Sequence, residues 1–168
     1  MRRSAQNLPG KPHRKTGLAP QLAAKLRVAV LRAEYNSEIT LSLESHCVRE
    51  LRRGGIAAKH IDLYSVPGCF EIPLVAQRLA RLHRYDAFIA LGAVIRGDTD
   101  HFRLVADECA RGIMQVSLAE NIPIIFEVLA TYNRRDALLR AGNNKYNKGL
   151  EAAQSALSVL ATLRRLKG

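Results

Sequence analysis

The chain has 168 residues, of which 48% are hydrophobic, and a formal net charge of +11. That length suits one domain able to bury about 70% of its unfolded surface. No apolar run reaches the ~20 residues of a membrane span, and no secretory h-region appears near the start, so we expect a soluble, cytoplasmic protein.

The positive charge is concentrated at the start of the chain. Residues 1–33 hold eight Lys or Arg and no acid, which leaves 18 minus 15, or +3, for the rest. Because the body is only mildly basic and carries no recognition motif, we expect no specific nucleic-acid partner. Residues 1–20 combine basic residues with Pro and Gly, which predicts a basic flexible arm before a single domain over residues 21–168. An acid-free arm also fits a transit peptide, although it lacks a clear amphipathic helix.

The first elements predict a strand, a helix and a second strand. Residues 26–31 are apolar and of strand length. The helix that follows starts after a polar turn, with Ser37 as a candidate cap, and ends at Gly54-Gly55. Residues 60–64 then alternate polar with apolar side chains, as expected of a strand at the edge of a sheet.

The central unit lies between Asp86 and Met114. Residues 86–95 form an almost unbroken apolar run, typical of a parallel strand that is covered on both faces. A polar turn over residues 96–101 follows, and apolar residues then recur at helical spacing. Before this unit, residues 66–73 predict a rigid turn with Pro73 at the first helical position.

The last third predicts one more strand and two helices. The strand covers residues 122–129, with Pro123 tolerable only near its start. Asn133 caps a short helix through Arg140, and a longer amphipathic helix ends the chain. Four successive strand–helix units with right-handed crossovers predict an α/β fold with a parallel sheet between helices.

Three cysteines, Cys47, Cys69 and Cys109, show neither a CxxC pair nor metal-ligand spacing. We expect free thiols, a reducing compartment and no metal site. Two of them have the pattern of core residues, whereas Cys69 sits in a turn and is a weak candidate nucleophile. Neither a GxGxxG nor a Walker A sequence is present, so no organic cofactor has a visible anchor.

The turns after the first three strands converge on one rim of a parallel sheet. They carry Tyr35-Asn36, then Gly68 to Glu71, then Gly97 to His101. His101 falls in the first turn of a helix, whose positive end favours a neutral imidazole and attracts an anion. Together these groups suit a flat heterocycle and a phosphate. Each of these residues also has an interpretation without a functional role. Tyr35 could be a surface aromatic residue, and Glu71 could interact with the positive end of a helix dipole. Thr99 could be a helix cap, and His101 a solvent-exposed histidine.

Three motifs carry a resemblance to a known family. They are Val66-Pro67-Gly68-Cys69-Phe70-Glu71-Ile72-Pro73, Ala90-Leu91-Gly92-Ala93-Val94-Ile95-Arg96-Gly97-Asp98-Thr99-Asp100-His101-Phe102 and Asn147-Lys148-Gly149. In this order and at these intervals they resemble the signature of the lumazine synthases of riboflavin biosynthesis, over about residues 26 to 163. The resemblance implies a flavodoxin-like three-layer sandwich with a four-stranded parallel sheet, a possible extra N-terminal strand, and helices on both faces.

The resemblance also implies an activity. It is the condensation of 5-amino-6-(D-ribitylamino)uracil with 3,4-dihydroxy-2-butanone 4-phosphate to 6,7-dimethyl-8-ribityllumazine, a transferase reaction that releases phosphate and water. No cofactor and no metal are implied. The implied partners are further copies of the chain in a pentamer, with sites between subunits, and riboflavin synthase.

By position in the family pattern, His101 is the implied proton shuttle. Tyr35 would stack on the pyrimidine beside Asn36, and Asp98 and Thr99 would bind phosphate. The other implied substrate-binding residues are Cys69, Phe70, Glu71, Ala93, Val94, Ile95, Phe126, Arg140 and Lys148, of which Phe126 and Arg140 would come from the adjacent subunit.

Four residues depart from the usual pattern: Tyr35, Cys69, Arg103 and Glu127. An extra carboxylate at Glu127 is expected to raise neighbouring pKa values. Two further readings remain open from sequence: a noncatalytic flavin or lumazine binding module on the same scaffold, and weak, nonspecific attraction of nucleic acid to the arm. Pentamer, decamer and sixty-subunit shell also remain open.

Overall fold

The computed structural model describes residues 18–166 and is built on one parallel sheet. The strand order is β2-β1-β3-β4, so β2 lies at an edge, as its alternating pattern predicts. The strands are β1 (Val28–Ala33), β2 (Ile61–Val66), β3 (Ala87–Ile95) and β4 (Ile124–Thr131). Most of the predicted arm, and with it the possible extra strand, lies outside the described residues; the described part begins with a short helix, α1 (Pro20–Ala23).

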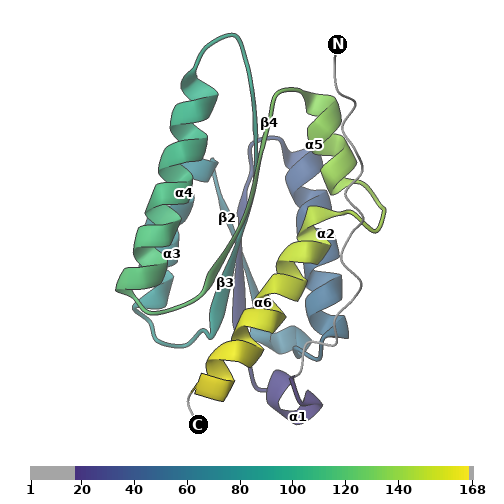
Figure 1. Cartoon of the computed structure of the whole chain (residues 1–168), viewed down its shortest axis with the longest axis vertical. Coiled ribbons are helices and arrows are strands. Elements are labelled where there is room, and N and C mark those ends of the chain that lie inside the picture. Colours follow the sequence, from purple (N-terminus) through teal and green to yellow (C-terminus); the bar gives the residue numbers. More distant parts are fainter. Residues whose placement is uncertain (1–17, 167–168) are drawn as a thin grey trace.

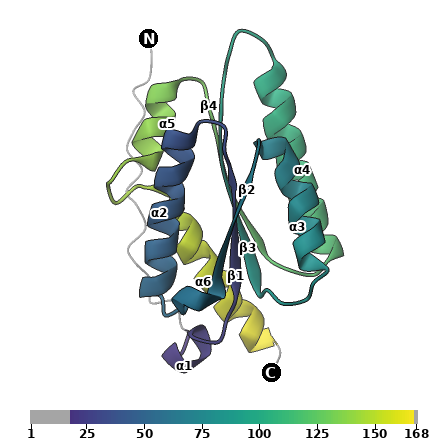
Figure 2. The ribbon, with the colours of Figure 1, turned by 180° about the vertical axis from the view of Figure 1, so that it is seen from behind.

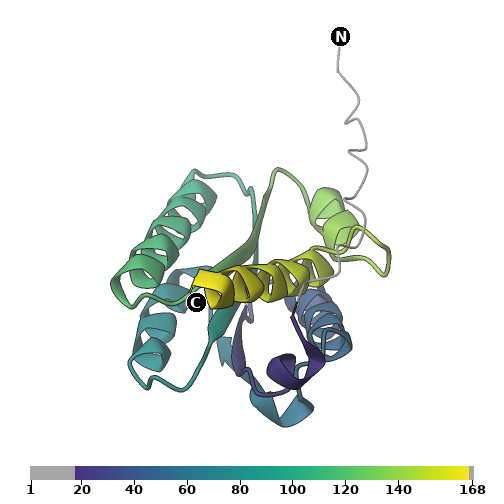
Figure 3. The ribbon, with the colours of Figure 1, turned by 60° about the horizontal axis from the view of Figure 1, so that its bottom comes forward.

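Helices cover both faces of the sheet and make three layers (Figures 1 and 2). One face carries α2 (Ser37–Arg53), α5 (Arg134–Ala141) and α6 (Lys148–Leu166), and the other carries α3 (Ile72–Ala80) and α4 (His101–Ala119). Short 3-10 turns, η1 (Ala58–His60) and η2 (Cys69–Glu71), flank β2. Figure 3 brings the lower end forward and shows α6 running across that end of the molecule, where it packs against α2. The predicted flavodoxin-like sandwich is confirmed.

The central strand β3 explains why the core divides in two. Ala87, Ile89 and Leu91 point into the core under α2, α5 and α6, whereas Phe88 and Ala90 point into the core under α3 and α4. All five are fully buried. Because both faces of this strand are covered, its sequence is continuously apolar rather than alternating.

Several predicted boundaries and caps shift in the structure. β1 begins two residues later than predicted, because Arg27 uses its backbone N–H to bind a carboxylate oxygen of Asp86. β4 begins at Ile124, after Pro123, which has no N–H to give the ladder. Ser37 is not the cap of α2; Asn36 occupies that position at φ 58°.

Two further predicted helix starts are also displaced. Pro73 is the second residue of α3 rather than the first, because Ile72 already has helical geometry. Thr99 does not cap α4; the cap position belongs to Asp100, which makes no side-chain capping bond. The cap of α5 is as predicted, since the side chain of Asn133 accepts a hydrogen bond from the N–H of Asp136.

The start of α6 gives a structural reason for the Asn147-Lys148-Gly149 motif. The buried Asn147 side chain donates to the carbonyls of Ala141 and Gly142 and accepts from the N–H of Gly149. A Cβ on Gly149 would lie 2.0 Å from the carbonyl oxygen of Leu43 on α2. Only glycine therefore allows α6 and α2 to approach this closely.

No helix within residues 18–166 combines the length and the apolar character needed to cross a membrane.

Candidate active site

The β1–α2 turn lies at the carboxyl edge of the sheet and presents Tyr35 and Asn36. The left-handed backbone of Asn36 turns its side chain toward β3, where Nδ2 donates to the carbonyl of Ala93 at 2.9 Å. Tyr35 donates its backbone N–H to the carbonyl of Pro67 at 3.1 Å, while its side chain is 74% exposed. The turn is therefore tied to β3 by the Asn36 side chain and to the residue after β2 by the Tyr35 backbone, and the Tyr35 ring stays free for a ligand.

The β2–α3 turn brings Glu71 and Phe70 to the same edge. A carboxylate oxygen of Glu71 accepts the N–H of Gly68 at 2.9 Å, which closes the turn, and the second oxygen has no hydrogen-bond partner among the described residues. The ring of Phe70 is exposed. Cys69 between them is buried, and its Sγ would lie 2.4 Å from a Cβ on Gly92.

The environment of Cys69 argues against the nucleophile reading. Burial raises the pKa of its thiol to about 11, an effect that a backbone hydrogen bond from Ala93 only partly offsets. The thiol is therefore protonated near neutral pH. Cys47 and Cys109 are buried free thiols, as predicted for core residues, and burial also raises the pKa of each.

The β3–α4 connection carries the predicted proton-transfer and phosphate residues. Ala93 and Val94 end the buried part of β3, Ile95 is partly exposed, and the chain then arches beyond the sheet before α4 begins (Figure 1). The side chains of Asp98, Thr99 and His101 are exposed and make no hydrogen bond to any described residue. His101 is the first residue of the 19-residue helix α4. The unpaired N–H groups at this helix start suit an anion.

The remaining three predicted residues lie elsewhere in the chain. Phe126 pairs in register with Ala90 on β3, three residues before Ala93, or about 10 Å toward the amino end. Arg140 is exposed at the end of α5 and donates to the carbonyl of Asp136. Lys148 begins α6, on the face of the sheet opposite α4, and forms an ion pair with Glu151. No hydrogen bond or ion pair joins these three residues to the rim formed by the first three turns.

Glu127 shares the surroundings of Lys148. It lies on β4 between Ile125 and Leu129, which pack toward α2 and α6, and it makes no hydrogen bond or ion pair with a described residue. Burial raises the pKa of its carboxyl to about 7, against the opposing influence of Lys148, and Glu151 raises it further. From the sequence we expect Glu127 to raise the pKa of neighbouring groups, and in the structure the pKa of its own carboxyl is itself raised.

Two surface cavities lie beside the predicted residues rather than over them. A cavity of about 560 Å³ separates the first turns of α4 from the end of β4, between Arg96, Phe102 and Tyr132. A second, of about 390 Å³, lies along α5 near Leu138 and Leu139. Neither is lined by any predicted site residue.

The sequence reasoning missed one cluster at this edge, formed by Arg96, Phe102 and Tyr132. The Tyr132 and Phe102 rings meet edge to face at 6.5 Å between centroids, and the Arg96 guanidinium lies 5.9 Å from the Tyr132 centroid. The signal available in the sequence was an aromatic residue shortly after the predicted strand over residues 122–129. The pairing itself joins distant segments and has no local signature.

Within residues 18–166, no three His, Cys, Asp or Glu side chains are grouped to hold a metal ion. A family model described as 6,7-dimethyl-8-ribityllumazine synthase matches residues 25–164 of the chain. The match spans all four strands and every residue discussed at the carboxyl edge.

Proposed function

The chain belongs to the 6,7-dimethyl-8-ribityllumazine synthase family, and we propose that it catalyses the reaction for which that family is named. The reaction joins 5-amino-6-(D-ribitylamino)uracil to 3,4-dihydroxy-2-butanone 4-phosphate and releases 6,7-dimethyl-8-ribityllumazine, phosphate and water. The observation that carries the proposal is the set of unpaired side chains at one sheet edge, with an exposed imidazole at the start of a long helix.

In this proposal the uracil substrate binds over β1 and β2. The exposed ring of Tyr35 stacks on the pyrimidine beside Asn36, and the backbone of Ala93, Val94 and Ile95 faces the same ring. Stacking on an aromatic side chain suits a planar heterocycle. Glu71, through the carboxylate oxygen that Gly68 leaves free, accepts hydrogen bonds from the ribityl hydroxyls, with the backbone of Cys69 and Phe70 alongside.

The phosphate binds at the start of α4. Asp98 and Thr99 supply polar contacts there, and the helix N-terminus supplies N–H donors and positive potential. His101 exchanges protons as the substrate amine attacks the ketone carbonyl and water leaves to form the imine. The same imidazole assists as the carbon–oxygen bond to phosphate breaks. General acid–base help of this kind is typically worth ~10² to 10⁴ in rate.

A second subunit completes the site in this proposal. Phe126 and Arg140 of one chain lie away from the rim of that chain, so in this proposal they serve the rim of its neighbour in a pentamer, and Lys148 completes the pocket. A guanidinium such as that of Arg140 binds a phosphate through two parallel hydrogen bonds. Head-to-tail contacts that place one edge against another generate rings. Light scattering of the purified protein separates a pentamer from a decamer and from a sixty-subunit shell.

The proposed reaction also suggests a partner protein and a cellular location. The product is the substrate of riboflavin synthase, which is the proposed macromolecular partner. Three free thiols support a reducing compartment, so we place the enzyme in the cytoplasm. No cofactor takes part in the proposed chemistry.

Mixing the two purified substrates with the protein and following lumazine fluorescence tests this proposal. We expect product in proportion to enzyme, with one phosphate released for each lumazine formed. A noncatalytic flavin or lumazine binding module would bind the product and form none. Saturable product binding without turnover would therefore replace the enzyme proposal with that alternative.

A further inference from the structure

The loop between β3 and α4 is held only at its ends. At the first end, the N–H of Arg96 donates to the carbonyl of Thr131 at 2.9 Å. At the second, the carbonyl of Asp100 accepts from the N–H of Arg103 at 2.9 Å. Between them, Gly97, Asp98 and Thr99 make no hydrogen bond to any described residue. The proposed phosphate ligands therefore occupy a stretch of chain without internal support.

Tyr132 contacts both ends of this loop. It follows Thr131 directly, and its ring lies 5.9 Å from the guanidinium of Arg96, in the range of a cation–π contact. The same ring meets Phe102, the neighbour of His101, at 6.5 Å between centroids and 64° between planes. Both contacts have the geometries that aromatic rings prefer. The side chain of the first residue after β4 thus spans the distance between the start of the loop and the first turn of α4.

We propose that Tyr132 is a positioning residue that holds the loop carrying Asp98, Thr99 and His101 in its binding geometry. The inference rests on the proposed function, because it assigns that loop to the phosphate-bearing substrate. In this proposal Tyr132 acts through the loop and not through a contact of its own with the substrate.

The surroundings of the ring favour this role over a contribution to the core. The Tyr132 side chain is 74% exposed, so its removal uncovers little apolar surface. Its hydroxyl makes no hydrogen bond to a described residue, so the two ring contacts are what the side chain provides. Arg96, Phe102 and Tyr132 all line the cavity of about 560 Å³, and within the described residues no other aromatic ring contacts Arg96 or Phe102.

Three substitutions at one position separate the possible roles of the ring. Tyr132→Phe keeps both ring contacts, Tyr132→Leu keeps apolar bulk without a π face, and Tyr132→Ala removes both. Leu118→Ala is the matched control, because Leu118 is equally exposed at the far end of α4. Steady-state constants are measured for each substrate in turn, together with the melting temperature and the assembly mass by light scattering.

We expect Tyr132→Ala to lower kcat/KM for the butanone phosphate roughly 10- to 100-fold, since small misplacements of positioned groups have effects of this size. KM for the uracil substrate should stay within about twofold, because its proposed contacts come from the other two turns and from the end of β3, which the ladder to β4 holds without Tyr132. Tyr132→Phe and Leu118→Ala should match the wild type in kcat and in KM for both substrates. Tyr132→Leu should have a kcat/KM for the butanone phosphate between those of Tyr132→Phe and Tyr132→Ala. A general structural defect would change both substrates alike.

Several results would overturn the inference. They are full activity in Tyr132→Ala, an equal loss in Tyr132→Phe, and an equal rise in KM for both substrates. If the wild type forms no lumazine, the proposed function fails instead. Calorimetric titration with inorganic phosphate then still tests the loop: about tenfold weaker binding by Tyr132→Ala than by Tyr132→Phe supports the inference, and equal binding contradicts it.

Discussion

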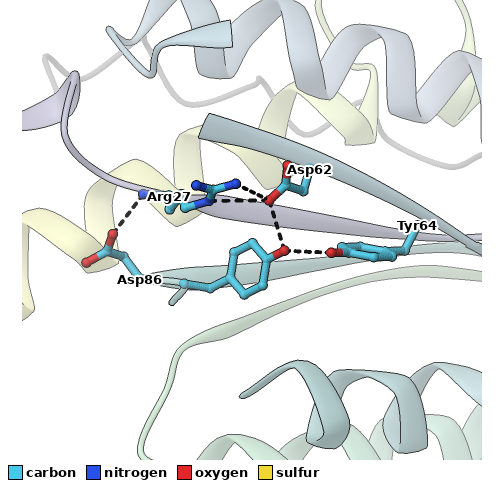
Figure 4. A network of polar contacts seen from close by, with 5 residues as sticks. Arg27, Asp62, Tyr64 and Asp86 are labelled. Atoms are coloured by element: carbon cyan, nitrogen blue, oxygen red, sulfur yellow. Dashed lines mark hydrogen bonds and ion pairs between the residues drawn. The ribbon is translucent and has the colours of Figure 1, made fainter. Parts of the chain in front are cut away.

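The two ends of the sheet use the same kinds of side chain in opposite ways. At the amino end, a continuous series of hydrogen bonds links five side chains or backbone groups, those of Asp86, Arg27, Asp62, Tyr85 and Tyr64 (Figure 4). Arg27 binds Asp62 at 2.8 Å, Tyr85 donates to the same carboxylate at 2.9 Å, and the hydroxyls of Tyr64 and Tyr85 lie 2.6 Å apart. At the carboxyl end, Tyr35, Asp98, Thr99 and His101 have exposed side chains without hydrogen-bond partners in the described chain.

This difference separates residues that stabilise the fold from residues available to a ligand. A polar group that is already paired offers little to a substrate, and removing one partner costs folding free energy. An unpaired, exposed group costs the fold little and can bind. We therefore expect substitutions at the amino end to change stability and those at the carboxyl end to change activity.

The largest expected effect is at His101. His101→Ala should lower kcat for lumazine formation by ~10² to 10⁴, because the reaction loses its proton carrier. The fluorescence assay measures it. The melting temperature should stay the same within error, since the exposed imidazole makes no bond to the described chain. An unchanged kcat would remove His101 from the mechanism.

Arg140→Ala should act on binding rather than on turnover. We expect KM for the butanone phosphate to rise roughly tenfold, because a charge-assisted phosphate contact is lost. Arg135→Ala, an exposed arginine on the same helix, is the matched control. Equal effects of the two substitutions on KM would show that Arg140 contributes only general positive charge.

At the amino end, Asp62→Asn should destabilise the protein by about 0.5–1 kcal/mol at pH 7, since Arg27 and Tyr85 lose a charged acceptor but solvent screens the partly exposed pair. The hydrogen bond from Arg27 is the main cause that lowers the pKa of Asp62 below its usual 3.8. The stabilisation by the carboxylate is therefore present above pH 3.8 and is lost as the pH falls through the lowered pKa. Denaturant unfolding should show the difference from wild type shrink below about pH 4, while kcat per folded molecule stays unchanged. A difference that does not shrink at all as the pH falls below 3.8 would contradict the assignment.

A similarly small effect is expected at Glu127, where a substitution should stabilise the protein at alkaline pH, whereas Asp62→Asn destabilises it. Its pKa is raised from 4.5 to about 7, so the folded chain binds a proton more tightly than the unfolded chain. Stability from this group is complete below pH 4.5 and is lost as the pH rises through 7. Glu127→Gln should leave stability unchanged near pH 4.5 and raise it by about 1 kcal/mol at pH 8, less than the full shift implies because the group is partly exposed. Equal unfolding curves at pH 8 would show that the carboxylate is well solvated.

Long periodic segments made most of the fold predictable from sequence. The apolar run of β3, the helical repeat of α4 and the alternation in β2 all result from local burial patterns, and the strand–helix order then limits the topology. The caps were less predictable, because Asn36 and Ser37 are both good N-cap residues and the choice depends on the distant carbonyl of Ala93.

The candidate site was predictable only in part, for a related reason. The convergence of the Tyr35, Glu71 and His101 turns follows from parallel strand polarity alone. The burial of Cys69 depends on the absence of a side chain at Gly92 on the neighbouring part of β3. The contacts of Tyr132 join residues 30 or more positions apart. Roles for Phe126, Arg140 and Lys148 came from family resemblance, since one chain does not bring them to the rim.

The most direct test of the contrast between the two ends measures unfolding free energy and kcat on the same preparations of His101→Ala and Asp62→Asn. The account predicts that His101→Ala keeps wild-type stability and loses at least ~10² in kcat, whereas Asp62→Asn loses stability and keeps wild-type kcat. Loss of turnover in Asp62→Asn, or wild-type turnover in His101→Ala, would contradict the assignment of catalysis to the carboxyl end of the sheet.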